Sequence, residues 1–180
     1  AMMLAQGRLV AMPTETVYGL AADARNSQAV AGIYAAKGRP SFNPLIVHAP
    51  DLATAETIGI FDTDARRLAG AFWPGALTLV VPQRPDAGIA SLVTAGLDTV
   101  AIRVPAHPIA QHLLHAFGGV VAAPSANPSG RISPTTAQHV MAGLDGKLAA
   151  VLDAGPGPVG VESTIVGWQD GAPVLLRPGG

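Results

Sequence analysis

The sequence predicts an α/β fold of the α+β type, with helices packed on a mixed β-sheet. Short apolar runs alternate with segments of helical periodicity in the earlier part of the chain, which is typical of helices that cover a sheet. The last predicted strands follow one another without a helix between them, which argues against a purely parallel sheet. No internal repeat, charge block or linker divides the chain, so we expect one domain over residues 1–180.

The predicted strands are short apolar runs bounded by breakers or polar residues. The first covers residues 9–12 and ends at Pro13. The remaining strands are expected over residues 45–47, 77–81, 100–104, 120–123, 149–152, 164–166 and 174–176.

Helices are predicted where apolar residues recur at helical spacing and a stop signal follows. The segment 26–37 has this spacing and is stopped by Gly38. Ser133 resembles an N-cap and Pro134 a first helical residue, which predicts a helix from there to about Met141. Two further helices are expected over residues 64–72 and 108–117.

The composition excludes several classes of protein. The chain has no cysteine, so it has no disulfide framework, thiolate zinc site or cysteine nucleophile. Hydrophobic residues make up 49% of the chain, yet no apolar run reaches the roughly 18 residues of a membrane helix. The net charge of −1 argues against non-specific nucleic-acid binding as the main role. We expect a cytoplasmic protein without membrane contact.

Two apparent motifs are better explained without a ligand. Residues 155–160 match G-x-G-x-x-G, but two positions are prolines and a strand, not a helix, is expected to follow. We therefore predict a surface loop and not a dinucleotide site. The histidines at 107, 112 and 115 have no neighbouring carboxylate in the sequence and are interpreted as a solvated helix face, with no metal bound by the protein.

Four segments place polar residues at strand ends, where ligand sites of α/β sheets gather. In the second of them, Lys37 and Arg39 flank a glycine in a loop stiffened by prolines, an arrangement that suits a polyphosphate. The four segments are Pro13–Gly19, Lys37–Pro44, Ala123–Gly130 and Glu162–Thr164.

These segments, in this order, resemble the YrdC-like family, the threonylcarbamoyl-AMP synthases. Further matching motifs are Trp73-Pro74-Gly75, Ala101–Pro105 and Leu176–Gly179, so the resemblance covers essentially the whole chain. It implies a twisted mixed sheet with a concave, positively charged active-site face. The segments 162–164 and 177–179 are most similar to the longer, two-domain version, whose linker and second domain lie beyond residues 1–180. The chain is therefore expected to be either the catalytic domain of that version or a single-domain member.

The resemblance also implies an activity, that of a nucleotidyltransferase. Such enzymes convert L-threonine, bicarbonate and ATP into L-threonylcarbamoyladenylate and pyrophosphate, for the threonylcarbamoyl modification of adenosine 37 in tRNA. Mg²⁺ is expected with ATP, held by phosphate oxygens and water. The implied partners are the downstream tRNA threonylcarbamoyl-transfer proteins, with possible weak tRNA binding.

The family pattern transfers residue by residue onto this sequence. It implies that ATP is bound by Lys37, Arg39, Asn43, Ser125, Asn127, Ser133 and Arg177, with the main chain of Thr99 near the adenosine. It implies that threonine is bound by Thr16, His48, Arg103 and Ser163, with the main chain of Ala123 nearby. Lys37 and Arg39 are expected to be the catalytic cations, because this reaction needs positioning and charge neutralisation more than a protein nucleophile.

Two alternative functions remain open. Related domains bind double-stranded RNA or tRNA through a basic concave face, and this chain could be such a binding module. It could also be a domain of a carbamoyltransferase that uses carbamoyl phosphate. Pyrophosphate release that depends on threonine would separate synthesis of the adenylate from both alternatives.

Overall fold

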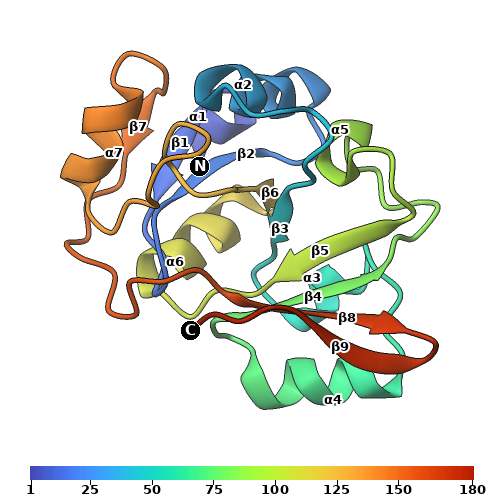
Figure 1. Cartoon of the computed structure of the whole chain (residues 1–180). Helices are drawn as coiled ribbons and strands as arrows, with labels where there is room; N and C mark the ends of the chain where they lie inside the picture. The colour runs from blue at the N-terminus through green and yellow to red at the C-terminus, as the bar shows by residue number, and fades with distance from the viewer.

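The computed structural model describes residues 1–180 and contains a nine-stranded mixed sheet that forms the middle of the molecule (Figure 1). The strand order is β7-β1-β2-β6-β3-β5-β4-β8-β9. The strands are β1 (Val10–Met12), β2 (Gly19–Asp23), β3 (Ile46–His48), β4 (Leu77–Pro82), β5 (Thr99–Arg103), β6 (Val121–Ala122), β7 (Ala150–Val151), β8 (Thr164–Gln169) and β9 (Ala172–Arg177).

Both kinds of strand pairing occur in the sheet. β1 with β7, β3 with β5 and β4 with β8 are parallel pairs, and the other five pairs are antiparallel. The last two strands form an antiparallel hairpin, as the absence of a helix between them predicted. The predicted mixed sheet is therefore confirmed.

Seven helices accompany the sheet. They are α1 (Met2–Ala5), α2 (Ser27–Lys37), α3 (Leu52–Ala55), α4 (Thr63–Phe72), α5 (Ser91–Thr94), α6 (Pro108–Phe117) and α7 (Ala137–Leu144). None of them has the length and apolar character needed to cross a membrane.

Local signals explain the ends of α2. The Asn26 side chain accepts hydrogen bonds from the backbone N–H groups of Gln28 and Ala29, which caps the start of the helix. Gly38 follows in the left-handed conformation with φ of 60°, which costs glycine no steric strain. The chain then turns away from the helix axis, and Arg39 begins the loop that leads to β3.

The predicted helix is present, but its predicted start, with Ser133 as N-cap and Pro134 as first helical residue, is wrong. The carbonyl of Pro134 accepts a hydrogen bond from the N–H of Tyr18, and the Ser133 hydroxyl donates to Glu162, so this segment is fixed as a loop. The helix α7 begins at Ala137 instead, where the Thr136 side chain accepts from the N–H of His139 and forms the N-cap.

The strand β2 was not predicted. It reads Gly-Leu-Ala-Ala-Asp and has no β-branched residue, so its sequence gives little strand signal. Its conformation comes from pairing with β1 on one side and β6 on the other.

Both faces of the sheet are covered near β1. Val10 and Met12 belong to a small buried cluster with residues of α1 and α6, whereas Ala11 belongs to the main core cluster, which includes residues of α2. This alternation is expected for a strand whose successive side chains point to opposite faces. The loops at the strand ends then project from a sheet that is held on both sides.

Candidate functional site

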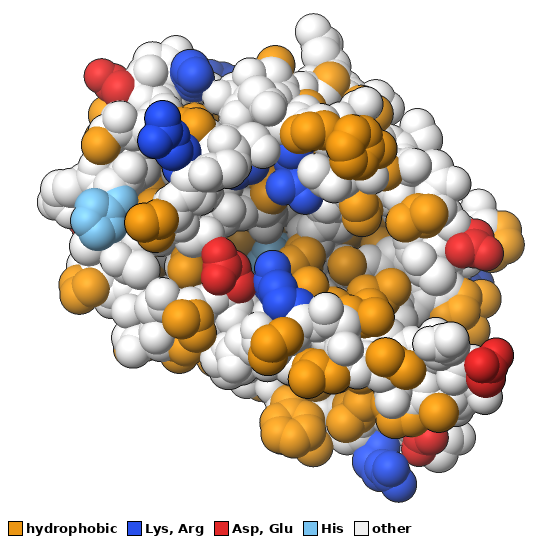
Figure 2. Space-filling view, in the orientation of Figure 1, with side chains coloured by type: hydrophobic (Ala, Val, Ile, Leu, Met, Phe, Trp, Pro, Cys, Tyr) orange, Lys and Arg blue, Asp and Glu red, His pale blue; other side chains and the backbone are white.

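A cleft of about 510 Å³ lies among the loops that contain the predicted polar segments. Figure 2 shows the molecule hollowed at its centre, with basic and hydrophobic side chains around the hollow. The cleft is lined by residues from β3, β4, β5, β8 and β9 and by the loops before β2, before β3 and after β6.

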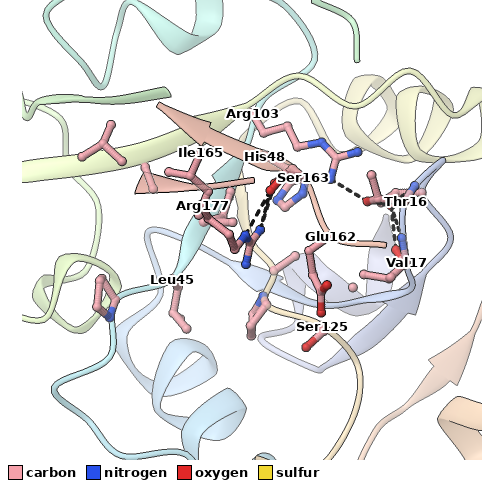
Figure 3. Close-up of a pocket in the computed structure, with 18 of the residues that line it drawn as sticks. Thr16, Val17, Leu45, His48, Arg103, Ser125, Glu162, Ser163, Ile165 and Arg177 are labelled. Carbon is pink, nitrogen blue, oxygen red and sulfur yellow. Dashed lines mark hydrogen bonds between the residues drawn. The ribbon is translucent and has the colours of Figure 1, made fainter. Parts of the chain in front are cut away.

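Nine of the thirteen predicted site residues line this single cleft. They come from positions as far apart in the sequence as 16 and 177, and they are Thr16, Arg39, His48, Thr99, Arg103, Ala123, Ser125, Ser163 and Arg177. Figure 3 shows the labelled members of this set gathered around one space. The other four, Lys37, Asn43, Asn127 and Ser133, are not part of the lining.

Lys37 lies behind the cleft wall. Its side chain is buried, and its Nζ donates hydrogen bonds of 2.5 Å each to the main-chain carbonyls of Ser125 and Asn127. Burial, together with the nearby charge of Arg39, lowers the pKa of Lys37 to about 8. In this structure Lys37 connects the end of α2 to the loop that carries Ser125.

Arg39 differs from Lys37 because it lines the cleft. Its Nε donates to the carbonyl of Asn43 at 3.3 Å and its Nη2 donates to that of Pro44 at 2.9 Å. The Asn43 carbonyl thus holds the Arg39 guanidinium, although the Asn43 side chain itself is not part of the lining. Both partners are neutral, so the positive charge of Arg39 is not compensated by them.

Arg103 is almost fully enclosed at the end of β5. Its Nη2 forms an ion pair of 2.6 Å with Glu15 Oε1, its Nη1 donates to Thr16 Oγ1 at 2.8 Å, and its Nε donates to the carbonyl of Gly75 at 3.1 Å. Burial lowers the pKa of Arg103, and the Glu15 carboxylate opposes this shift. A guanidinium stays charged in any case.

His48 lies next to this ion pair and is 3% exposed. Its Nδ1 is buried and has no hydrogen-bond partner in the protein. Burial, and then the positive charge of Arg103, lower the pKa of His48 to about 3. The imidazole is therefore neutral at physiological pH. His48 lines the cleft, while its Nδ1 is buried without a partner.

Arg177 and Glu162 lie together on another side of the cleft (Figure 3). The Arg177 guanidinium donates twice to the carbonyl of Ser163, through Nε at 3.0 Å and Nη2 at 2.8 Å. Glu162 accepts a hydrogen bond from the Ser133 hydroxyl, which lowers the pKa of Glu162 below its ordinary value. Ser133 therefore reaches the cleft only through Glu162.

Asn127 is buried and acts inside its own loop. Its Nδ2 donates to the carbonyls of Pro128 and Arg131, while its Oδ1 has no partner in the protein. It fixes the turn after Ser125 without contributing to the cleft lining.

Sequence reasoning missed several lining and supporting residues. Glu15 and Glu162 lie within two of the singled-out segments, so their positions gave a signal, but no role was assigned to them. The apolar part of the lining was not predicted, because apolar residues at or near strands look like ordinary core residues. These lining residues are Leu45, Val80, Leu97, Ala101, Ile165 and Leu176.

The chemistry available to the cleft is electrostatic. Three arginines, one neutral histidine and hydroxyl groups face it, together with one glutamate. No group of three or more His, Asp or Glu side chains is placed to hold a metal ion. Such a site is suited to bind and orient anions and amino acids.

Comparison with known proteins identifies the family. The model of the Sua5/YciO/YrdC family, described as "Telomere recombination", matches residues 2–179. The chain belongs to this family. It is 55% identical over 181 residues to the threonylcarbamoyl-AMP synthase of Bacillus subtilis strain 168, covering 100% of this chain and 52% of that protein. It is 48% identical to the enzyme of the same name from Pyrococcus abyssi, covering 97% of this chain and 51% of that protein. The chain spans about half the length of these relatives.

Solved structures of the family agree with the fold. The P. abyssi Sua5 structure complexed with L-threonine superposes with a TM-score of 0.96 at 47% identity, over 99% of this chain and 52% of that one. A full-length HypF structure superposes with a TM-score of 0.87 at 19% identity, over 99% of this chain and 28% of that one, which shows the shared fold alone. The resemblance and the α/β fold with a twisted mixed sheet are confirmed, while the positive character of the concave face stays a prediction.

Proposed function

We propose that residues 1–180 are the catalytic domain of a threonylcarbamoyl-AMP synthase. The domain would convert L-threonine, bicarbonate and ATP into L-threonylcarbamoyladenylate and pyrophosphate. The observation that carries this proposal is the cleft, because residues expected for threonine and residues expected for ATP line it together. The relatives named for this activity support the same assignment.

The two substrates would occupy opposite parts of the cleft. Threonine would lie near Arg103, His48 and Thr16, where a buried guanidinium can pair with the carboxylate. The nucleotide would lie near Arg39, Arg177 and Ser125, with its adenosine against the apolar lining and the main chain of Thr99. Lys37, Asn127 and Ser133 would serve the nucleotide site from behind the lining.

The reaction needs a carbamate oxygen to attack the α-phosphorus of ATP. Threonine and bicarbonate would form the carbamate with loss of water, and pyrophosphate would leave as the new phosphorus–oxygen bond forms. Arg39 and Arg177 would neutralise the charge on the phosphates, which is the main requirement of such a step. Mg²⁺ would arrive with ATP and remain bound to phosphate oxygens and water.

The product would serve tRNA modification. L-threonylcarbamoyladenylate is an activated donor, so the proteins that use it would transfer the threonylcarbamoyl group to adenosine 37 of tRNA. The domain would act in the cytoplasm, with at most weak tRNA binding of its own. By comparison with the relatives, a linker and a second domain would accompany it in the longer protein.

Pyrophosphate release tests this function directly. Pyrophosphate release from ATP should be rapid only when threonine and bicarbonate are both present, and the adenylate should be detected by mass spectrometry. Release that is independent of threonine would overturn the assignment. Turnover with carbamoyl phosphate in place of bicarbonate and threonine would indicate a carbamoyltransferase domain. Salt-dependent tRNA binding without any pyrophosphate release would indicate a binding module.

A further inference from the structure

Thr78 is a polar residue that the proposed reaction does not use. It lies on β4, is fully buried, and is not part of the cleft lining. Its hydroxyl lies 2.7 Å from Oγ of Ser163, which does line the cleft. Ser163 is the one hydrogen-bond partner that the Thr78 side chain has.

The direction of this hydrogen bond follows from the burial of Thr78. If Ser163 donated, the Thr78 hydroxyl hydrogen would have no acceptor and no access to solvent. Leaving a buried donor unpaired is unfavourable, and native structures rarely do so. Thr78 must therefore donate to Ser163 Oγ.

Ser163 Oγ accepts a second hydrogen bond from Arg177. The Nη2 of Arg177 lies 3.2 Å from this oxygen, and a guanidinium can only donate. A serine oxygen has two lone pairs, and both are now occupied. The one hydrogen-bonding group that Ser163 still has is its own hydroxyl hydrogen, and the side chain lines the cleft (Figure 3).

We propose that Thr78 is a positioning residue that makes Ser163 a pure hydrogen-bond donor, so that this point of the cleft recognises the carboxylate of the amino-acid substrate and not its ammonium group. This inference rests on the proposed function, because it specifies which group of threonine Ser163 recognises. The guanidinium of Arg177 contacts Ser163 Oγ, and that of Arg103 lines the same cleft, so two cations lie near this point, although Glu15 pairs with Arg103 and Glu162 lies near Arg177.

The test uses Thr78→Val, which removes the hydroxyl but keeps the branched shape that suits β4. Dissociation constants are measured by calorimetry for L-threonine and for L-threoninol, which has no carboxylate. We expect Thr78→Val to weaken threonine binding about 10- to 150-fold, the range of one lost hydrogen bond to a charged group. Threoninol should bind the variant and the wild type equally, and Thr78→Ser should restore threonine binding.

A double-mutant cycle on threonine affinity separates a positioning role of Thr78 from a general effect on the fold. In the Ser163→Ala background, Thr78→Val should cause no further loss of threonine affinity, because the residue through which it acts is gone. An additive loss, or an equal loss for threonine and threoninol, would overturn the proposal. So would wild-type threonine affinity in Thr78→Val.

Two further outcomes are also decisive. If Thr78→Val does not fold, Ser163→Ala alone tests whether Ser163 is a donor to the carboxylate. This variant should weaken threonine binding and leave threoninol binding unchanged. Equal losses of affinity for threonine and threoninol would overturn the assignment. If the wild type binds no threonine at all, the proposed function itself fails, together with the inference that rests on it. Threonine binding by the wild type with no effect of either substitution removes the inference alone.

Discussion

The ion pair between Glu15 and Arg103 offers a test of the proposed threonine site. Glu15 Oε1 lies 2.6 Å from Arg103 Nη2, and the two side chains are 12% and 4% exposed. Glu15→Gln keeps an oxygen that can accept this hydrogen bond but removes the negative charge. The buried guanidinium then lacks a counter-charge until a carboxylate from the substrate arrives.

The size of the effect can be worked out from this geometry. Breaking a buried ion pair outright costs about 3–5 kcal/mol. Because Glu15→Gln keeps the hydrogen bond and removes only the counter-charge, we expect it to lower the free energy of unfolding by less, about 2 kcal/mol. For 180 residues, an unfolding entropy of about 2.1 cal/mol/K per residue converts this loss into a Tm decrease of about 5 °C. Saturating threonine should raise the Tm of the variant more than that of the wild type, because its carboxylate replaces the missing charge.

Thermal unfolding with and without threonine measures both effects. Glu56→Gln is the matched control, because Glu56 forms an ion pair of the same length with Arg66 but both side chains are far more exposed. An exposed pair contributes no more than about 1 kcal/mol. This prediction is wrong if Glu15→Gln has the same Tm as the wild type, or if threonine raises the Tm of the variant no more than that of the wild type. In either case Arg103 does not share its charge between Glu15 and the substrate.

Three further predictions concern other parts of the site. Arg39→Ala should lower the rate of adenylate formation about 10²-fold or more at sub-saturating ATP, whereas the control Arg67→Ala, at an exposed arginine, should leave it unchanged. Pyrophosphate release measures both rates. A normal rate in Arg39→Ala would show that Arg39 does not bind the phosphates. The pKa of His48 is about 3 in the folded state and about 6.5 in the unfolded chain. Between pH 3 and pH 6.5 the unfolded chain therefore binds more protons than the folded protein. Stability should therefore fall as pH decreases from 6.5 to 3, and His48→Gln should flatten that part of the chemical-denaturation profile; an unchanged slope would contradict the burial argument. Valine should bind more weakly than serine, since it leaves a polar partner of the threonine hydroxyl unpaired, while serine loses only a methyl group worth about 1–3 kcal/mol; calorimetry that finds valine and threonine equal would exclude a hydroxyl contact.

Most elements could be predicted from the sequence because their signals are local. The helix α2 has a capping residue at its start and a glycine at its end, and both act in the structure as expected. The strand β2 and the loop at Ser133 could not be predicted in this way. In each case, hydrogen bonds to segments distant in the sequence determine the conformation, as the bond between Tyr18 and Pro134 illustrates.

The same distinction applies to the site. The motif segments predicted which residues gather at the cleft, since polar groups at strand ends meet there. They did not predict the partners of those residues. Lys37 is separated by 88 and 90 residues from the carbonyls it contacts, and Arg103 by 88 residues from Glu15. Spacing along the chain carries no information about such contacts.

The partners of each cation indicate how a chain of net charge −1 could hold a triphosphate. Arg103 is paired with a carboxylate, and Lys37 is enclosed by two carbonyls behind the lining. Arg39 and Arg177 differ from both, because main-chain carbonyls hold their Nε and Nη2 groups while their Nη1 groups have no partner in the protein. The Glu162 carboxylate lies near Arg177, so Arg177 keeps less of its charge uncompensated than Arg39 does. Neutral carbonyls fix the orientation of a guanidinium without cancelling its charge, which is what a preorganised anion site requires. A phosphate bound at this cleft would therefore meet Arg39 and Arg177 directly, and Lys37 would support it by holding the loop of Ser125 in place.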